Sequence, residues 1–187
     1  MAQFSIFFPL LAHNEGGYVS PEEAEKKHDS GGETYKGIAR AKHPDWKGWG
    51  IIDSYKPQAT FPRVLDNDHT LQDLILSFYK GEFWDVLSGD AILNQSIANF
   101  MADWGANAGP SVPIKHVQKV LGFEGIDQDG KMGPKTLAAL NVSSNADFFA
   151  KLKAERITFY RDVVEAHPED AGFLDGWIAR TNHFVYA

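Results

Sequence analysis

The chain has 187 residues, of which 43% are hydrophobic and 23% charged, enough for one substantial hydrophobic core with at most a small appended unit. Its formal net charge is −7 and its Lys and Arg residues are not clustered, which excludes nucleic acid as the expected partner because phosphate binding requires clustered cations. It contains no cysteine, which excludes disulfides, thiolate zinc sites and cysteine nucleophiles.

The first apolar segment predicts a helix. Its apolar residues follow the i, i+3, i+4, i+7 spacing of one buried helix face: Phe4, Phe7, Phe8 and Leu11. Pro9 interrupts this pattern, so the helix either kinks at that residue or starts there. Gly16 and Gly17 provide the expected stop, and a continuous helix would bring Glu15 near its apolar face.

This segment is not expected to be a signal peptide, because it lacks a basic start and a small-x-small cleavage site and contains a proline. No apolar run approaches the roughly 18 residues of a membrane span. We therefore expect a soluble protein that is made in the cytoplasm without a recognisable export signal and does not insert into membranes.

Residues 18 to 62 are rich in Gly, Pro, Asp and aromatic residues, which predicts loops and a small sheet, with a short charged turn at Pro21–Lys27. A helical period returns at Leu71, and Pro168 separates the last two predicted helices. Further helices are predicted around residues 71–79, 97–104, 112–121, from Pro134, and over about 145–166 and 171–184. The predicted fold class is mainly α, a helical bundle with a small irregular or β region near the N-terminus.

Several familiar site motifs fail in this sequence. The loop Gly125–Met132 resembles a phosphate-binding loop, but Met132 replaces the required Ser or Thr and no strand precedes it. Asp127 and Asp129 suggest a calcium loop, but the later ligand positions do not fit. The seven His residues show no zinc-binding spacing, and no serine-hydrolase elbow is present. We expect neither a metal nor a cofactor.

Two carboxylates near glycines, Glu15 and Asp29, suggest glycoside hydrolysis, which generally needs one protonated acid and one ionised base or nucleophile. Glu15 on the apolar side of a helix end would tend to keep its proton, whereas Asp29 in a polar loop would stay ionised. The alternative is purely structural, because Glu before Gly-Gly can end a helix and Asp before Ser-Gly-Gly is ordinary turn chemistry.

Longer motifs carry a resemblance to a known family. The stretches "HNEGGYV", "HDSGGETYKGIA", "NFMADWGANAGP" and "VPIKHVQKVLG…DQDGKMGPKTLAAL" resemble the glycoside hydrolase family 108 type of muramidase, lysozyme-like enzymes of phages and bacteria. Their usual C-terminal companion is a predicted peptidoglycan-binding region, and some relatives carry the label of secretion activator. The resemblance implies an α+β lysozyme-like fold, with a catalytic part at 1–110 and a helical peptidoglycan-binding-like part at 111–187, packed as one compact unit.

The resemblance also implies residue roles. Glu15 would protonate the glycosidic oxygen between N-acetylmuramic acid and N-acetylglucosamine. Asp29 would act as base or electrostatic partner, and the Thr34 hydroxyl would position water. Glu33, next to Thr34, is an alternative second carboxylate.

Other residues are candidates for binding the sugar. Tyr18 and Tyr35 would line the groove or serve as scaffold. Asp103 and Asn107 match a D-x-x-x-N element and, being four residues apart, would share one helix face. Trp104 continues an apolar stripe, so a core position is favoured.

The expected function is that of a monomeric peptidoglycan hydrolase, acting on the glycan strand after holin-type or dedicated export. The Trp-rich insert at residues 40 to 56 departs from the family pattern and is a candidate for reshaping the groove. Two alternatives stay open, a non-catalytic peptidoglycan-binding protein and a secretion-associated regulatory protein.

Overall fold

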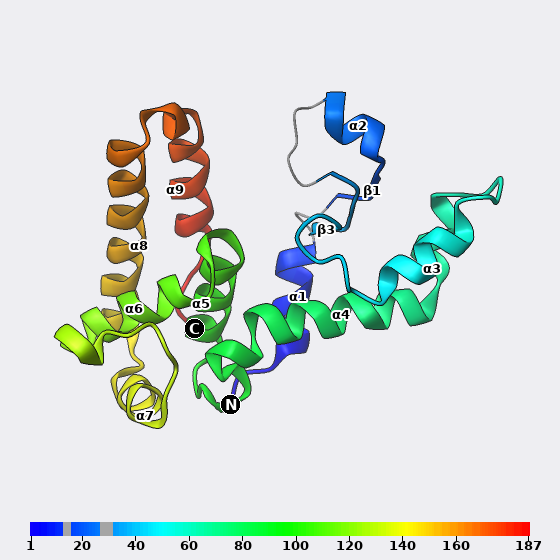
Figure 1. Ribbon diagram of the computed structural model, residues 1–187. Helices are drawn as coiled ribbons and strands as arrows, with labels where there is room; N and C mark the ends of the chain where they lie inside the picture. Colours follow the sequence, from blue (N-terminus) through cyan, green and yellow to red (C-terminus); the bar gives the residue numbers. More distant parts are fainter. Residues whose placement is uncertain (13–15, 27–31) are drawn as a thin grey trace. The chain divides into compact units, whose positions relative to one another are not determined.

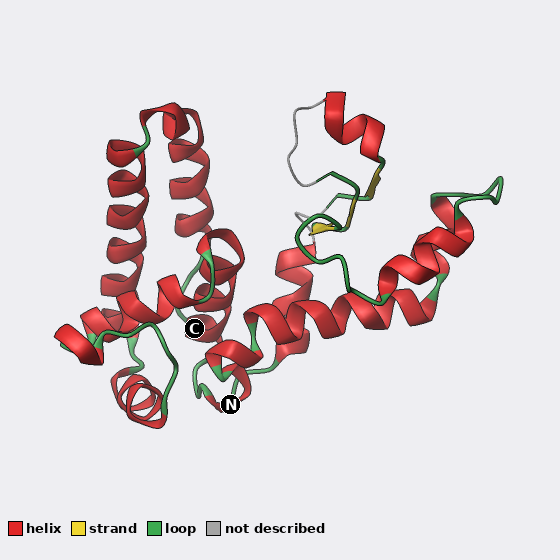
Figure 2. Ribbon diagram, viewed as in Figure 1, coloured by secondary structure: helices red, strands yellow, loops and turns green. Residues whose placement is uncertain are grey.

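The computed structural model describes residues 1–12, 16–26 and 32–187. The described residues are mainly helical and include one small antiparallel sheet (Figures 1 and 2), which confirms the predicted fold class. The α-helices are α1 (Phe4–Ala12), α2 (Pro21–Lys26), α3 (Gly48–Tyr55), α4 (His69–Phe83), α5 (Gln95–Ala108), α6 (Ser111–Val120), α7 (Pro134–Ser143), α8 (Ala146–Ala166) and α9 (Leu174–His183). The strands are β1 (Tyr18–Val19), β2 (Thr34–Tyr35) and β3 (Ile38–Ala39). Short 3-10 segments are η1 (Arg63–Asn67), η2 (Asp85–Leu87), η3 (Gly89–Ala91), η4 (Gly125–Asp127) and η5 (Pro168–Phe173).

The chain divides into two compact units. The smaller unit consists of residues 8–80 and holds the sheet, and the larger unit consists of residues 1–7 and 81–187 and holds α5 to α9. The division into a catalytic part at 1–110 and a binding part at 111–187 stays a prediction. Within the described part of the chain, no helix is both long enough and apolar enough to cross a bilayer.

Helix α1 begins at Phe4 and continues through Pro9, so the alternative of a helix that starts at Pro9 is wrong. Phe7 is fully buried and its ring stacks on that of Trp84, with centroids 5.7 Å apart. The burial of this face outweighs the hydrogen bond that the exposed Pro9 cannot make.

The sheet is built around a tight hairpin between β2 and β3. The strand order is β1-β2-β3, and Thr34 pairs with Ala39. Lys36 and Gly37 form the two-residue turn with φ angles of 42° and 78°, a combination that suits the right-handed twist of a hairpin. The Tyr79 hydroxyl of α4 donates to the carbonyl of Lys36 at 2.6 Å, so α4 supports the turn.

Helix α3 corrects the prediction for residues 18 to 62, which consisted of loops, a small sheet and one short charged turn, with no helix at Gly48–Tyr55. Trp49 and Ile52 are buried, and the ring of Trp46 lies directly against Gly48, where a Cβ atom would overlap it. Glycines at 48 and 50 weaken the local helical signal, but packing of the aromatic side chains stabilises the helix.

Helix α5 is the centre of the larger unit. All residues from 97 to 105 are buried, and Asn94 caps the helix by accepting a hydrogen bond from the Ile97 amide at 3.0 Å. Trp104 is fully buried, with its ring 4.8 Å from that of His116, so the predicted core position is confirmed. The helices predicted further along the chain are also confirmed as α6, α7, α8 and α9.

The loop around Gly125–Met132 folds onto the side chain of Gln118. The Gly130 amide donates to Gln118 Oε1 at 2.9 Å, and Gln118 Nε2 donates to Asp129 Oδ1 at 2.9 Å and to Thr136 Oγ1 at 3.2 Å. The Asp129 carboxylate therefore accepts hydrogen bonds that hold the loop together. No group of three or more His, Cys, Asp or Glu residues among those described is arranged to hold a metal ion.

Candidate active site

The hairpin brings Glu33 opposite Arg40. Thr34 pairs with Ala39, and one step outward the Arg40 amide donates to the Glu33 carbonyl at 2.8 Å. Arg40 Nε also lies 2.7 Å from Glu33 Oε2. Opposite charges at facing positions stabilise the pairing of two strands, so this contact closes the open end of the hairpin.

Glu33 is the most enclosed carboxylate of the smaller unit's described residues, with its side chain only 6% exposed. The Tyr18 hydroxyl donates to its Oε1 at 2.8 Å, and Lys56 Nζ lies 2.9 Å from the same oxygen. Arg40 occupies Oε2. The carboxylate is thus enclosed by two cations and one hydroxyl group, which hold it in place as part of the fold.

Asp53 completes an alternating set of charges that we call the ion cluster, made of Glu33, Arg40, Asp53 and Lys56. The Arg40 guanidinium donates to both oxygens of Asp53, at 3.0 and 2.7 Å. This bidentate contact, followed by the hydrogen bond from Lys56, lowers the pKa of Asp53 to about 2. The guanidinium also lies over the ring of Trp49, 4.4 Å from its centroid, so Arg40 joins the hairpin to α3.

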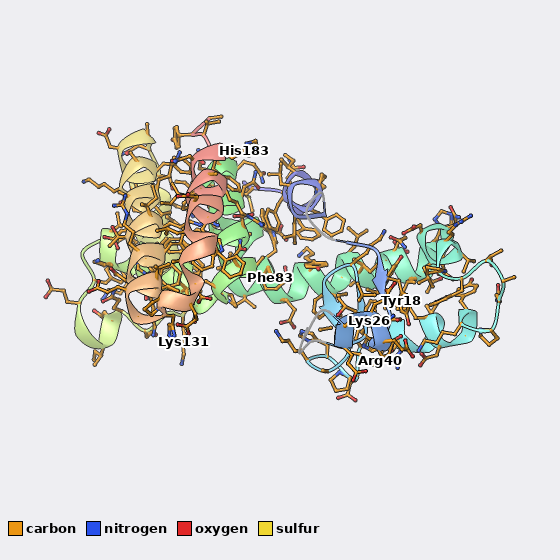
Figure 3. The ribbon with its side chains drawn as sticks, turned by 90° about the horizontal axis from the view of Figure 1, so that it is seen from above. Tyr18, Lys26, Arg40, Phe83, Lys131 and His183 are labelled. Atoms are coloured by element: carbon orange, nitrogen blue, oxygen red, sulfur yellow. The ribbon has the colours of Figure 1, made fainter. Side chains whose placement is uncertain are left out.

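Tyr18 and Arg40 both lie in the smaller unit (Figure 3), and Tyr18 contacts the ion cluster through Glu33. Its ring meets that of Phe61 edge-on at 4.7 Å, and its hydroxyl points to Glu33. Burial raises the pKa of Tyr18, and the hydrogen bond to the Glu33 carboxylate raises it further. The hydroxyl therefore acts as a fixed donor that holds β1 to the ion cluster.

Tyr35 is 1% exposed and belongs to the core of the smaller unit. Its hydroxyl donates to Asp66 Oδ1 at 3.3 Å and accepts from Gln72 Nε2 at 3.2 Å. Burial raises the pKa of Tyr35 to about 12. Of the two roles considered for Tyr35, lining the groove or supporting it, this burial favours the supporting role, and the assignment stays a prediction.

Thr34 is half-buried on β2, and its hydroxyl donates to the carbonyl of Gly32 at 3.0 Å. Because the proton of the hydroxyl is used in this bond, its oxygen is left as an acceptor for a water molecule or a sugar hydroxyl. Gly32 has a φ angle of 63°, a backbone conformation that favours glycine, so the local turn fixes the direction of this bond.

Two of the predicted catalytic residues, Glu15 and Asp29, lie outside the described residues. Their roles stay predictions. Among the described candidates, Tyr18, Glu33, Thr34 and Tyr35 all belong to the smaller unit, whereas Asp103 and Asn107 belong to the larger one.

Asp103 is a buried counter-ion, with its side chain 3% exposed. Arg156 Nη2 donates to Asp103 Oδ2 at 2.7 Å, and Arg180 Nη2 donates to Oδ1 at 2.6 Å. Asn107 shares its helix face, since its Nδ2 donates to the Asp103 carbonyl at 2.9 Å. The fully buried Arg156 needs a neighbouring negative charge, so the geometry supports a structural role for Asp103 and lends no support to sugar binding by its carboxylate.

Sequence reasoning missed Arg40, Asp53 and Lys56. The sequence did contain a signal for Arg40. A hairpin with Lys36 and Gly37 as its two turn residues pairs Tyr35 with Ile38 and Thr34 with Ala39, so the next facing residues are Glu33 and Arg40. Asp53 and Lys56 required α3 to be recognised as a helix, since only there do residues three apart lie side by side.

Comparison with known proteins matches two successive stretches of the chain to two families. The family profile described as Glycosyl hydrolase 108 matches residues 8–109, and the one described as Predicted Peptidoglycan domain matches residues 112–182. The solved structure titled "Structure of Brucella abortus SagA" is similar to this chain at 25% sequence identity and a TM-score of 0.64, covering 96% of this chain and 90% of that chain. No curated protein sequence matches. Because the first profile covers more than half of its residues, the chain belongs to the glycosyl hydrolase 108 family and carries a peptidoglycan-domain region after it.

Proposed function

We propose that this protein is a peptidoglycan hydrolase of the N-acetylmuramidase type, which cleaves the bond between N-acetylmuramic acid and N-acetylglucosamine with Glu15 as general acid. One observation carries the proposal: within the family match, the Tyr18–Glu33 hydrogen bond joins the two segments that bear the predicted carboxylates. Glu15 stands three residues before Tyr18, and Asp29 four residues before Glu33. Both carboxylates are thus tethered by short stretches of chain to a single fixed contact.

The ion cluster supports Asp29 as the second carboxylate. A general base must accept a proton from water, but the oxygens of Glu33 already face Tyr18, Lys56 and Arg40. Glu33 then serves to hold the hairpin, while the Thr34 oxygen, left as an acceptor, helps to place the attacking water. Asp29 would act as the base or would stabilise the positive charge that develops on the sugar.

The protein would act on the cell wall as a monomer, after holin-type or dedicated export. Its peptidoglycan-domain region would keep it on the wall between cleavage events, since a second binding site on the same chain raises the effective concentration of substrate.

The test is the release of reducing sugar ends from purified peptidoglycan, with the products identified by mass spectrometry. Glu15→Gln keeps the size of the side chain and removes the transferable proton, so the rate should fall by roughly 10²–10⁴-fold. Glu25→Gln, an exposed change on α2, is the matched control and should keep the full rate. Equal rates for Glu15→Gln and the unsubstituted protein would disprove the assignment of the acid.

The second candidate is a non-catalytic peptidoglycan-binding or secretion-associated regulatory protein, and the peptidoglycan-domain match over residues 112–182 favours it because wall binding does not require hydrolysis. It predicts wall binding without release of reducing ends. A Glu15→Gln variant with its full biological effect, together with no release from the unsubstituted protein, would support this candidate.

A further inference from the structure

Helix α8 is followed by η5 and α9 in the larger unit (Figure 1). Three aromatic rings from these elements stack on one another, from a buried ring to an exposed one. The rings of Tyr160 and Trp177 have centroids 5.0 Å apart and planes 27° apart. Those of Trp177 and Phe173 have centroids 5.8 Å apart and planes 24° apart. Tyr160 is 4% exposed and Phe173 is 61% exposed. We call these three residues the aromatic stack.

The inner end of the aromatic stack is held firmly. The Tyr160 hydroxyl accepts hydrogen bonds from Arg156 Nε at 3.2 Å and from Arg156 Nη2 at 3.1 Å. Arg156 is fully buried and is bound to Asp103. Because each ring rests on the one beneath it, the orientation of the exposed Phe173 ring is set before any ligand arrives, which lowers the entropy cost of binding.

A glycine precedes each of the two outer residues of the aromatic stack. Gly172 precedes Phe173 and Gly176 precedes Trp177, and a Cβ atom added at either glycine would meet nothing within 4 Å. Gly176 lies in α9, where glycine is less favourable than alanine. No close packing requires a glycine at either position, and the space around both is open at residues that adjoin Phe173 and Trp177 in the chain.

The chemistry of this surface suits a sugar. One face of a pyranose ring is formed by C–H groups, which pack against an aromatic face, while its hydroxyl and acetamido N–H groups need acceptors. The same segment supplies three carboxylates, Glu169, Asp170 and Asp175. These negative charges disfavour nucleic acids and anionic membranes, which carry charge in the group that would meet the site, whereas an N-acetylglucosamine ring is itself uncharged. One exposed ring with bare backbone is far smaller than the roughly 800 Å² that a stable protein interface buries on each partner.

We propose that the aromatic stack is a glycan-binding site, in which Phe173 packs against an N-acetylated sugar ring of the peptidoglycan strand. The site lies within residues 112–182, the match to the peptidoglycan domain. The identity of the glycan rests on the proposed function, but binding at Phe173 does not require that the protein hydrolyse the strand.

The test measures binding by the full chain carrying Glu15→Gln, so that the ligand is not consumed. Co-sedimentation with insoluble peptidoglycan and calorimetric titration with a β-1,4-linked N-acetylglucosamine oligomer give two affinities. Phe173→Ala should weaken both by about tenfold, because the contact area of a phenyl ring is lost, and Phe173→Trp should restore them. Gly176→Leu should also weaken binding by covering the open surface, without lowering the midpoint of urea unfolding. Val142→Ala removes apolar surface from another side chain, 89% exposed on α7, and should change neither affinity.

Unchanged affinities in Phe173→Ala would overturn the proposal, as would no binding by the parent protein. A Phe173→Ala variant that altered the sedimentation coefficient but not the affinities would also overturn it, because the ring would then contact a second copy of the chain. Failure of the proposed function is distinguishable: Phe173-dependent binding by a protein that releases no reducing ends supports the glycan site and rejects hydrolysis. Release of reducing ends by a protein whose binding does not depend on Phe173 would support hydrolysis and reject the glycan site.

Discussion

At the scale of single residues, the charged groups around Asp103 and those around Asp53 lie in very different surroundings. Asp103 and Arg156 are buried, whereas the side chains of Asp53 and Lys56 are 46% and 37% exposed. Burial makes it costly to remove one partner of an ion pair, while water and salt weaken an exposed pair. The two clusters should therefore respond differently to substitution and to pH.

Asp103→Asn should lower the free energy of unfolding by about 3–5 kcal/mol, because it leaves the buried Arg156 without its counter-ion. Asp66→Asn is the matched control, since Asp66 is 64% exposed in its ion pair with Lys36, and should cost no more than about 1 kcal/mol. Urea unfolding followed by circular dichroism measures both. Similar losses in the two variants would mean that Asp103 is not a critical counter-ion.

Asp53 should contribute to stability in a defined pH range. Its pKa is lowered to about 2 by Arg40 and Lys56, so its contribution is complete above the ordinary Asp pKa of about 3.9 and is lost as the pH falls towards 2. The difference in urea midpoint between the unsubstituted protein and Asp53→Asn should therefore shrink between about pH 4 and pH 2. Added salt should reduce this difference at pH 5, because the side chain is partly exposed. A difference that grows on acidification would contradict the assigned contacts.

At the scale of elements, the sequence correctly predicted the helices that carry a long, regular stripe of apolar residues. The stripe from Ile97 to Trp104 is regular and fully buried, and α5 follows it. In contrast, α3 was missed because its eight residues include two glycines, and its stability comes from Trp46 and other side chains outside its own helical pattern. The same contrast holds for the candidate site. The sequence motif was enough to select Thr34 as a candidate, whereas the contacts of Glu33 could not be predicted because they depend on the strand register and on α3.

Gly89 offers a test of close packing between elements. It lies against the ring of the fully buried Trp84, with which a Cβ atom would overlap. Gly89→Ala should cost about 1–3 kcal/mol, the usual effect of overpacking a core. Gly81→Ala, in α4 with nothing within 4 Å of the added Cβ, is the control and should increase stability by up to about 1 kcal/mol. Thermal unfolding of both variants measures the contrast, and a neutral Gly89→Ala would show that Trp84 can move aside.

At the scale of the whole molecule, net charge should influence the encounter with substrate. The formal charge is −7, and peptidoglycan with free peptide carboxylates is also anionic, so repulsion slows association at low ionic strength. Activity on whole cell walls should rise as salt increases from about 10 mM to about 100 mM, where the Debye length falls to about 10 Å. Initial rates of reducing-end release test this, and rates that decline steadily from the lowest salt would contradict it.

The position of α5 has a consequence for how such proteins can be assembled in evolution. The helix lies at the end of the hydrolase match, yet its side chains pack on residues of the following match: Trp104 contacts His116, and Asp103 binds Arg156. Recombination of genes near residue 110 would remove these neighbours and leave Phe100 and Trp104 uncovered. The two regions are therefore not freely interchangeable, and exchange of one wall-binding region for another would require compensating changes on the buried face of α5 that packs on α6 and α8.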